Sequence, residues 1–294
     1  MRSVNPVGPR VPVRLLIVAW VAFWVILACG LFLGADQITY QAAGERLNAG
    51  HALYALSAGD RYIAPDPPYW SVPILYPPLI AVIWRPLAVL APVGPVLWWL
   101  ANAGALLAAS GWIARRSRPL VVIAAVGIGI TVASGNVGGL LVAGMTAAWE
   151  WRDDPRVGAL VAVMAAVKVL PVTLLLWLVT TRRWRALAWA TGAGAACVVL
   201  GMLAGPTTIF DYVGIARSAA PEPLSLAGLT GISPLIAAVV GGVAILMLPD
   251  RWSYRAAIAT TILASPALGV GSLVSVLPLG APYDAARSSS GKGF

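Results

Sequence analysis

Lys168 is a charged side chain inside an apolar stretch of the sequence. It lies in Met164-Ala-Ala-Val-Lys168-Val-Leu-Pro171, and it is one of only two lysines among the 20 basic residues. Because a charge in such a stretch is costly unless it faces a cavity or a partner, the residue is a candidate for function. Two interpretations stay open: a buried cation that binds an anionic ligand, or a structural cation that pairs with a helix carboxylate or extends to the membrane surface. Pro171 frees backbone carbonyls three residues later.

Asp36 is the second candidate. It directly follows the first apolar stretch and stands at the start of a polar segment, 35–73. A carboxylate at such an aqueous boundary can act as a general base for an attacking hydroxyl. Position alone fits a helix cap or a solvated charge equally well.

Other chemistries find little support in the sequence. His51 is the only histidine and has no carboxylate pair nearby, so no metal site is predicted, although a divalent ion beside a donor phosphate stays open. No Gly-rich phosphate-binding signature is present, so no nucleotide cofactor is expected. The net charge of +9 comes from short arginine clusters between apolar stretches, so nucleic acid is not an expected partner. Cys29 and Cys197 lie far apart within apolar runs and are expected to be buried hydrophobes.

Membrane helices must position these residues. Hydrophobic residues make up 60% of the 294 positions and charged residues only 11%. Several apolar runs have the length, roughly 17 to 25 residues, that crosses a hydrocarbon core of about 30 Å. We therefore predict an all-α, polytopic membrane protein with about nine transmembrane helices (eight to ten) and a single domain over 1–294.

The predicted spans follow from these runs. The long stretch 120–149 is divided at Ser134-Gly135-Asn136 into two short helices, and a further short helix from Asp36 to Ala49 lies along the membrane interface. The polar segments 35–73 and 205–230 then share the extracytoplasmic side, and a flexible tail follows. The remaining spans are predicted at 13–34, 76–91, 95–114, 157–180, 186–204, 232–248 and 256–279, with the tail at 281–294.

Arginine placement tests this count of crossings. The clusters at 182–185 and 251–255 fall in the cytoplasm, as the positive-inside rule requires. Arg115, Arg116 and Arg118 fall on the extracytoplasmic side, against the rule. The count therefore conflicts with the charge pattern at one cluster.

Several segments, taken in order, resemble one family. They are Asp36-Gln-Ile-Thr-Tyr40-Gln-Ala-Ala, Leu47-Asn-Ala-Gly50-His-Ala-Leu-Tyr54, Tyr76-Pro-Pro-Leu79 with Arg85-Pro-Leu-Ala88, Gly135-Asn136-Val-Gly-Gly-Leu-Leu, and Ala165-Ala-Val-Lys168-Val-Leu-Pro171 followed by Arg182-Arg-Trp-Arg185. With these motifs the chain resembles the polyprenyl-phosphate-mannose-dependent mannosyltransferases of glycosyltransferase family 87, in the GT-C superfamily. The family's distal motif, Ser-Pro followed by Trp and His-Tyr, is reduced here to Ser265-Pro266.

The resemblance implies a GT-C-like enzyme of the plasma membrane whose active site faces outward. Such an enzyme moves a hexose, with mannose the first candidate, from a polyprenyl-phosphate sugar to a glycolipid or cell-envelope glycan with inversion. It makes Asp36 the catalytic base. A phosphate leaving group needs positive charge, for which Lys168 and Arg46 are candidates. Further candidates for the sugar or lipid site are Tyr40, Tyr54, Tyr76 and Asn136.

Two other function classes stay open. One is a catalytically silent relative that binds polyprenyl phosphate or scaffolds envelope assembly. The other is a lipid or solute transporter, which would also use an intramembrane cation. A transporter is expected to show inverted repeats and paired discontinuous helices, and the sequence shows no such repeat.

Overall fold

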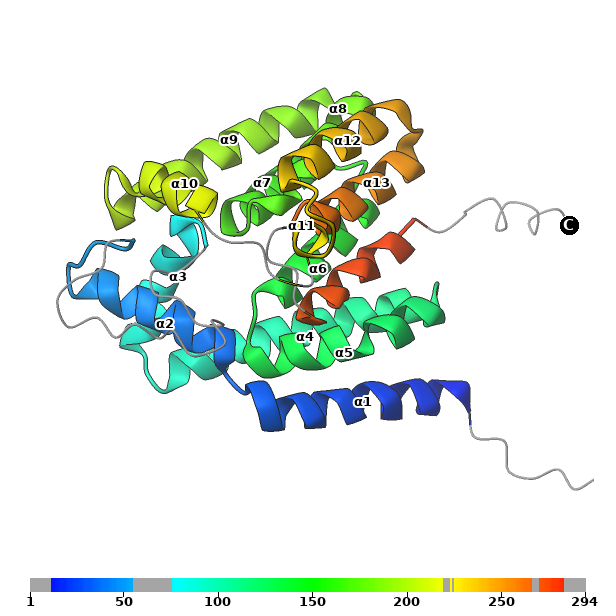
Figure 1. Cartoon of the computed structure of the whole chain (residues 1–294), viewed down its shortest axis with the longest axis horizontal. Helices are drawn as coiled ribbons and strands as arrows, with labels where there is room; N and C mark the ends of the chain where they lie inside the picture. Colours follow the sequence, from blue (N-terminus) through cyan, green and yellow to red (C-terminus); the bar gives the residue numbers. More distant parts are fainter. Residues whose placement is uncertain (1–11, 55–75, 219–222, 224, 266–269, 283–294) are drawn as a thin grey trace, which may run out of the picture.

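The computed structural model describes residues 12–54, 76–218, 223, 225–265 and 270–282, and the secondary structure in these ranges is entirely helical (Figure 1). The all-α prediction is confirmed for this part of the chain. Residues 55–75 of the predicted polar segment and 283–294 of the predicted tail lie outside the described residues.

The elements follow one another along the chain with short connections. They are α1 (Val13–Phe32), α2 (Ala35–Asn48), α3 (Pro78–Val89), α4 (Val93–Ala114), α5 (Arg118–Ser134), α6 (Gly138–Glu150), α7 (Val157–Val167), η1 (Leu170–Val172), α8 (Thr173–Thr180), α9 (Trp184–Gly201), η2 (Met202–Ala204), α10 (Thr208–Ser218), α11 (Leu226–Thr230), α12 (Pro234–Met247), α13 (Asp250–Leu263) and η3 (Val270–Gly280).

Hydrophobic side chains cover the outside of this bundle, as a membrane protein requires. Ile26 in α1 is 74% exposed and Leu235 in α12 is 71% exposed, burial patterns that water would disfavour and lipid accepts. Among the described residues, α1, α4 and α9 with η2 are long and apolar enough to cross a membrane, and six shorter apolar helices accompany them. The predicted membrane character is confirmed, whereas the count of about nine full-length spans is not.

One end of the bundle gathers the turns between α4 and α5, α6 and α7, α8 and α9, and α12 and α13. Arg116 pairs with Glu150 across the first two turns, with Nη2 to Oε1 at 3.5 Å. Arg183 pairs with Asp250 across the last two at 3.0 Å. An aromatic cluster from α6, α8 and α13 joins the two pairs. We call this the arginine-rich end; it comprises residues 112–118, 149–156, 177–185 and 249–255.

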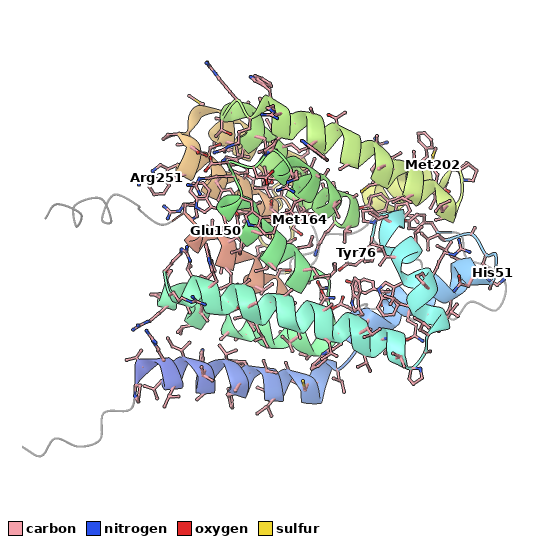
Figure 2. All side chains as sticks on the ribbon, turned by 180° about the vertical axis from the view of Figure 1, so that it is seen from behind. His51, Tyr76, Glu150, Met164, Met202 and Arg251 are labelled. Carbon is pink, nitrogen blue, oxygen red and sulfur yellow. The ribbon has the colours of Figure 1, made fainter. Side chains whose placement is uncertain are left out.

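The opposite end is built around α2, and we call it the α2 end; it comprises residues 34–54, 76–98, 133–138 and 205–217. Helix α2 packs tightly on α3, since a Cβ placed on Gly44 would lie 2.6 Å from the carbonyl oxygen of Trp84. The ring of Tyr54 lies 6.0 Å from the ring of Tyr212 in α10, so parts of the two predicted polar segments meet there. Figure 1 shows α2, α3 and α10 together on one side, and Figure 2 shows His51 on the side opposite Glu150 and Arg251.

Helix α3 does not cross the bundle, so the predicted return span at 76–91 is wrong. It has 12 residues, about 18 Å of helix, which is too short for a core of about 30 Å. Both of its ends lie at the α2 end: Arg85 Nε donates to Asn48 Oδ1 in α2, and the following α4 begins with Trp98, whose Nε1 donates to the Gly135 carbonyl. Burial of its apolar face among other helices explains why it resembles a span.

This correction removes the conflict among the arginine clusters. Because α3 stays at the α2 end, α4 runs from there to the arginine-rich end and carries Arg115 and Arg116 with it. Arg118 begins α5 at the same place. The three arginines that violated the charge rule therefore lie beside the other clusters.

The predicted single span 157–180 is also wrong, because the chain turns back within it. Helix α7 ends at Val167, and Lys168 adopts an extended backbone with φ −148° and ψ 116°. Helices α7 and α9 run in the same direction, since Gly158 faces Ala186. The connecting η1 and α8 must then return to the arginine-rich end, where α8 finishes. Helices α7 and α8 thus form a hairpin with Lys168 at its tip.

Two further boundaries can be compared with the sequence. The division of 120–149 is confirmed: α5 ends at Ser134, Gly135 takes a left-handed conformation with φ +69°, and α6 begins at Gly138. The predicted span 256–279 is wrong, because α13 ends at Leu263 and a separate 3-10 helix begins at Val270. A proline at position 266 disfavours helix in the residue before it, which accounts for the end of α13.

This arrangement predicts which positions share a membrane side. In a variant without native cysteines, single cysteines replacing Arg115 and Asp153 should react with an impermeant maleimide from the same side, and a cysteine replacing His51 from the other. All three positions are exposed. Labelling of sealed, oriented vesicles measures this, and reaction of positions 51 and 115 from one side would contradict the fold.

Candidate functional site

Five of the seven residues selected from the sequence come together at the α2 end: Asp36, Tyr40, Tyr76, Asn136 and Lys168. The rings of Tyr40 and Tyr76 lie edge to face with centroids 5.1 Å apart. Lys168 Nζ lies 5.7 Å from the Tyr76 ring centroid, and Asn136 Nδ2 donates to Tyr76 Oη at 3.2 Å. We call these five residues the Asp36 cluster. Figure 2 shows Tyr76 between His51 and Met164, which lies one helical turn before Lys168.

The turn between α5 and α6 presents Asn136 to this cluster. Gly135 provides the left-handed backbone that ends α5, a conformation that glycine adopts without strain. Asn136 Oδ1 accepts a hydrogen bond from Gly138 N at 2.7 Å, which satisfies a free amide at the start of α6. With its carbonyl so engaged, the Asn136 amide group points its Nδ2 at Tyr76. The turn therefore fixes both the helix start and the orientation of the side chain.

Tyr40 closes the cluster from inside. It is fully buried, and its Oη accepts a hydrogen bond from Val137 N at 3.4 Å. Its ring also lies against Trp84 and Trp98, at 6.2 Å and 5.8 Å. Tyr40 therefore supports the site from below, and the polar face of the cluster is left to the other members.

Asp36 occupies the first turn of α2 and keeps part of its surface exposed. Burial by the surrounding protein raises the pKa of its carboxyl above the ordinary value. The polar side chains of Ser134 and Asn136 and the positive charge of Lys168 oppose this rise only in part. A carboxylate with a raised pKa is a better proton acceptor than an ordinary one.

Ser134 was not selected from the sequence, yet it belongs beside Asp36. It is 2% exposed, and its hydroxyl makes no hydrogen bond of full geometry within the described residues. It lies close enough to the Asp36 carboxyl to lower that group's pKa. The sequence signal was its position directly before Gly135-Asn136, in the polar break between two apolar helices.

Lys168 has the features of an anion site. It follows the last turn of α7, where the helix dipole favours a positive charge. Within the described ranges it forms neither an ion pair nor a side-chain hydrogen bond, and the contact of its ammonium is with the Tyr76 ring. Asp36 is near enough to act on it electrostatically but does not neutralise it by contact. An ammonium in this state can receive an anionic ligand.

Arg46 and Tyr54 lie apart from the cluster. Arg46 stands ten residues after Asp36 on α2, about 15 Å along the helix axis, and its Nε donates to the Ala52 carbonyl at 2.5 Å. Tyr54 Oη donates to the backbone carbonyl of Tyr76, so it holds that residue from behind. The phosphate role of Arg46 and the sugar role of Tyr54 stay predictions that proximity does not support.

A metal site does not emerge from the part of the chain that the structure describes. No three His, Cys, Asp or Glu side chains lie close enough there to hold an ion. The polar groups of the Asp36 cluster are one carboxylate, one ammonium, two phenols and one amide. They suit proton transfer and binding of a phosphate.

The fold and the site together define a helical membrane protein with a base and a cation beside one another. The chain matches the model of glycosyltransferase family 87 over residues 74–275, more than half of its length, and it belongs to that family. It is therefore a glycosyltransferase, and the resemblance found from the sequence is confirmed.

The matched range divides the Asp36 cluster. It includes Tyr76, Asn136 and Lys168, whereas Asp36 and Tyr40 precede it. No curated protein and no solved structure matches the chain. The GT-C-like arrangement therefore stays a prediction.

Proposed function

We propose that this protein transfers a hexose, with mannose the first candidate, from a polyprenyl-phosphate sugar to a hydroxyl of a glycolipid or cell-envelope glycan. One observation carries the proposal: the Asp36 carboxyl, with its raised pKa, lies beside the unneutralised Lys168 ammonium. A donor whose leaving group is a phosphate on an apolar chain needs a cation at membrane depth and a base nearby.

The reaction is a single displacement. Asp36 removes the proton from the acceptor hydroxyl as its oxygen forms a bond to the anomeric carbon. The bond between that carbon and the phosphate oxygen breaks, and polyprenyl phosphate leaves with the electron pair. Lys168 stabilises the negative charge that develops on the phosphate. One displacement inverts the anomeric configuration.

The neighbouring groups hold these two in place. Tyr76 offers its ring to the Lys168 ammonium, a contact that stabilises the cation while no phosphate is bound. Asn136 fixes Tyr76 through its hydroxyl. The pairing of Tyr76 with both Asn136 and Lys168 supports a donor site between the α5–α6 turn and the α7–α8 hairpin.

Charge placement supports an outward-facing site in the plasma membrane. Helix α1 begins with Arg14 near the start of α5, because Trp20 Nε1 donates to the Val122 carbonyl. All arginine clusters then share the arginine-rich end, while the described part of the α2 end carries only Arg46, Arg85 and Arg217. The positive-inside rule assigns the first end to the cytoplasm. Acceptor and donor would meet on the extracytoplasmic side.

Replacing Asp36 by Asn should abolish transfer. Loss of a general base lowers the rate by about 10²- to 10⁴-fold, because Asn cannot accept the proton. The assay incubates membranes with radiolabelled polyprenyl-phosphate mannose and candidate acceptors. Glu45→Gln, which removes an exposed carboxylate from the same helix, should keep wild-type activity. Full activity in Asp36→Asn would show that another group is the base.

Replacing Lys168 by Met should weaken donor binding. A charge-assisted contact contributes about 1.5–3 kcal/mol, so the donor KM should rise by roughly 10- to 100-fold. Arg85→Met removes a cation of the α2 end that contacts Asn48 and not the cluster, and it should leave the donor KM unchanged. An unchanged donor KM in Lys168→Met would make that lysine a structural cation.

The pH profile should reveal the raised pKa of Asp36. The base acts in its deprotonated form, so kcat/KM should fall as the pH drops through this pKa, at a higher pH than for an ordinary carboxyl. Asn136→Ala removes a group that lowers the pKa and should move the acidic limb further up. An acidic limb at or below the ordinary carboxyl value would contradict the assignment.

A further inference from the structure

The tip of the α7–α8 hairpin interrupts regular backbone pairing. Lys168 is extended, a 3-10 turn follows, and Pro171 has no N–H to donate. A break of this kind inside an apolar bundle needs other groups to satisfy its carbonyls and to hold its shape. The position of Lys168 therefore depends on what binds the backbone just after it.

Two threonines bind that backbone. Thr173 begins α8 and Thr261 lies in α13, and their hydroxyl oxygens are 2.7 Å apart. Both hydroxyls also reach the carbonyl of Leu170, two residues after Lys168, at 3.2 Å and 3.3 Å. Both reach the carbonyl of Ala257 in α13 as well, at 3.0 Å and 2.9 Å. The pair is buried, so water does not compete for these contacts.

The proton count shows how the pair works. Two hydroxyls supply two protons: one donates across the oxygen pair, and the other donates to a carbonyl. The bond between the two hydroxyls and the bond to Leu170 both join the hairpin to α13. Removal of the Thr261 hydroxyl would leave the Thr173 hydroxyl to its own segment and to the Ala257 carbonyl.

We propose that Thr173 and Thr261 are positioning residues that set the location of the Lys168 ammonium by tying the hairpin tip to α13. The inference rests on the proposed function for its effect on donor affinity. Its structural part concerns Lys168 alone and holds for any anion bound there.

The adjacent Thr260 provides a matched control. It lies on the same helix and is 3% exposed, against 7% for Thr261. Its hydroxyl donates to the Ala256 carbonyl of its own helix, and its side chain packs against Gly241 in α12. It does not touch the hairpin tip. A valine at 260 or at 261 therefore removes one buried hydroxyl at nearly constant shape, but only the second loosens the hairpin.

The first test measures donor kinetics. Thr261→Val should raise the donor KM by about tenfold, the effect of one lost hydrogen bond of roughly 1 kcal/mol and a displaced cation, with a smaller change in kcat. Thr261→Ser keeps the hydroxyl and should restore the wild-type KM, and Thr260→Val should match the wild type. Equal KM values for Thr261→Val and Thr260→Val would overturn the proposal, as would failure of Thr261→Ser to restore the KM.

The second test does not need activity. Lys168 and Lys292 are the only lysines, so in a Lys292→Arg background reductive methylation reports on Lys168 and the chain's α-amino group, which mass spectrometry separates. Thr261→Val should change the methylation rate of Lys168 severalfold, while Thr261→Ser and Thr260→Val leave it unchanged. An unaltered rate in folded Thr261→Val would overturn the proposal. If this rate changes but the wild type transfers no sugar from any polyprenyl donor, the proposed function fails and the positioning role stands.

Discussion

The arrangement depends on one constraint: the ammonium of Lys168 cannot face hydrocarbon without a compensating partner. The chain meets this constraint by breaking the helix at the charged residue. Helix α7 stops at Val167, the backbone becomes extended, and the side chain turns to the aromatic ring of Tyr76. The hairpin, the threonine pair that holds it and the polar turn at Asn136 all follow from the need to keep one cation inside an apolar bundle.

The same constraint explains why Asp36 is useful at its position. A carboxylate in direct contact would neutralise the lysine and leave no charge for a ligand. Asp36 is instead held on a separate element, α2, which is fixed by the Gly34 amide bonded to the Ala133 carbonyl at 2.9 Å and by the close approach of Gly44 to Trp84. The base and the cation therefore sense one another electrostatically while each stays available to a substrate.

Much of this could be predicted from the sequence because it depends on local pattern. Long apolar runs gave α1 and α4, and the polar Ser134-Gly135-Asn136 gave the break between α5 and α6. Asp36 and Lys168 were selected because charges at the edge or inside of apolar runs are rare, and the structure brings them together. The membrane class and the family needed no tertiary information.

The parts that failed depend on direction and partners. Hydropathy counts apolar residues, but it does not distinguish a helix that faces lipid from one that is buried by neighbours. Ile80 and Trp84 of α3 are fully buried in protein, so the helix resembles a span without being one. The return of α8 and the pairing of Thr173 with Thr261 depend on contacts between segments 88 residues apart, and Arg46 was misplaced because helix spacing separates it from Asp36.

The most direct test of the account is a structure of the protein in lipid with a non-transferable polyprenyl-phosphate sugar analogue. The account predicts that the phosphate lies at Lys168 Nζ, that the sugar lies between Tyr76 and Asn136, and that the anomeric carbon faces Asp36. A phosphate bound at the arginine-rich end, or at Arg46 away from Lys168, would contradict it.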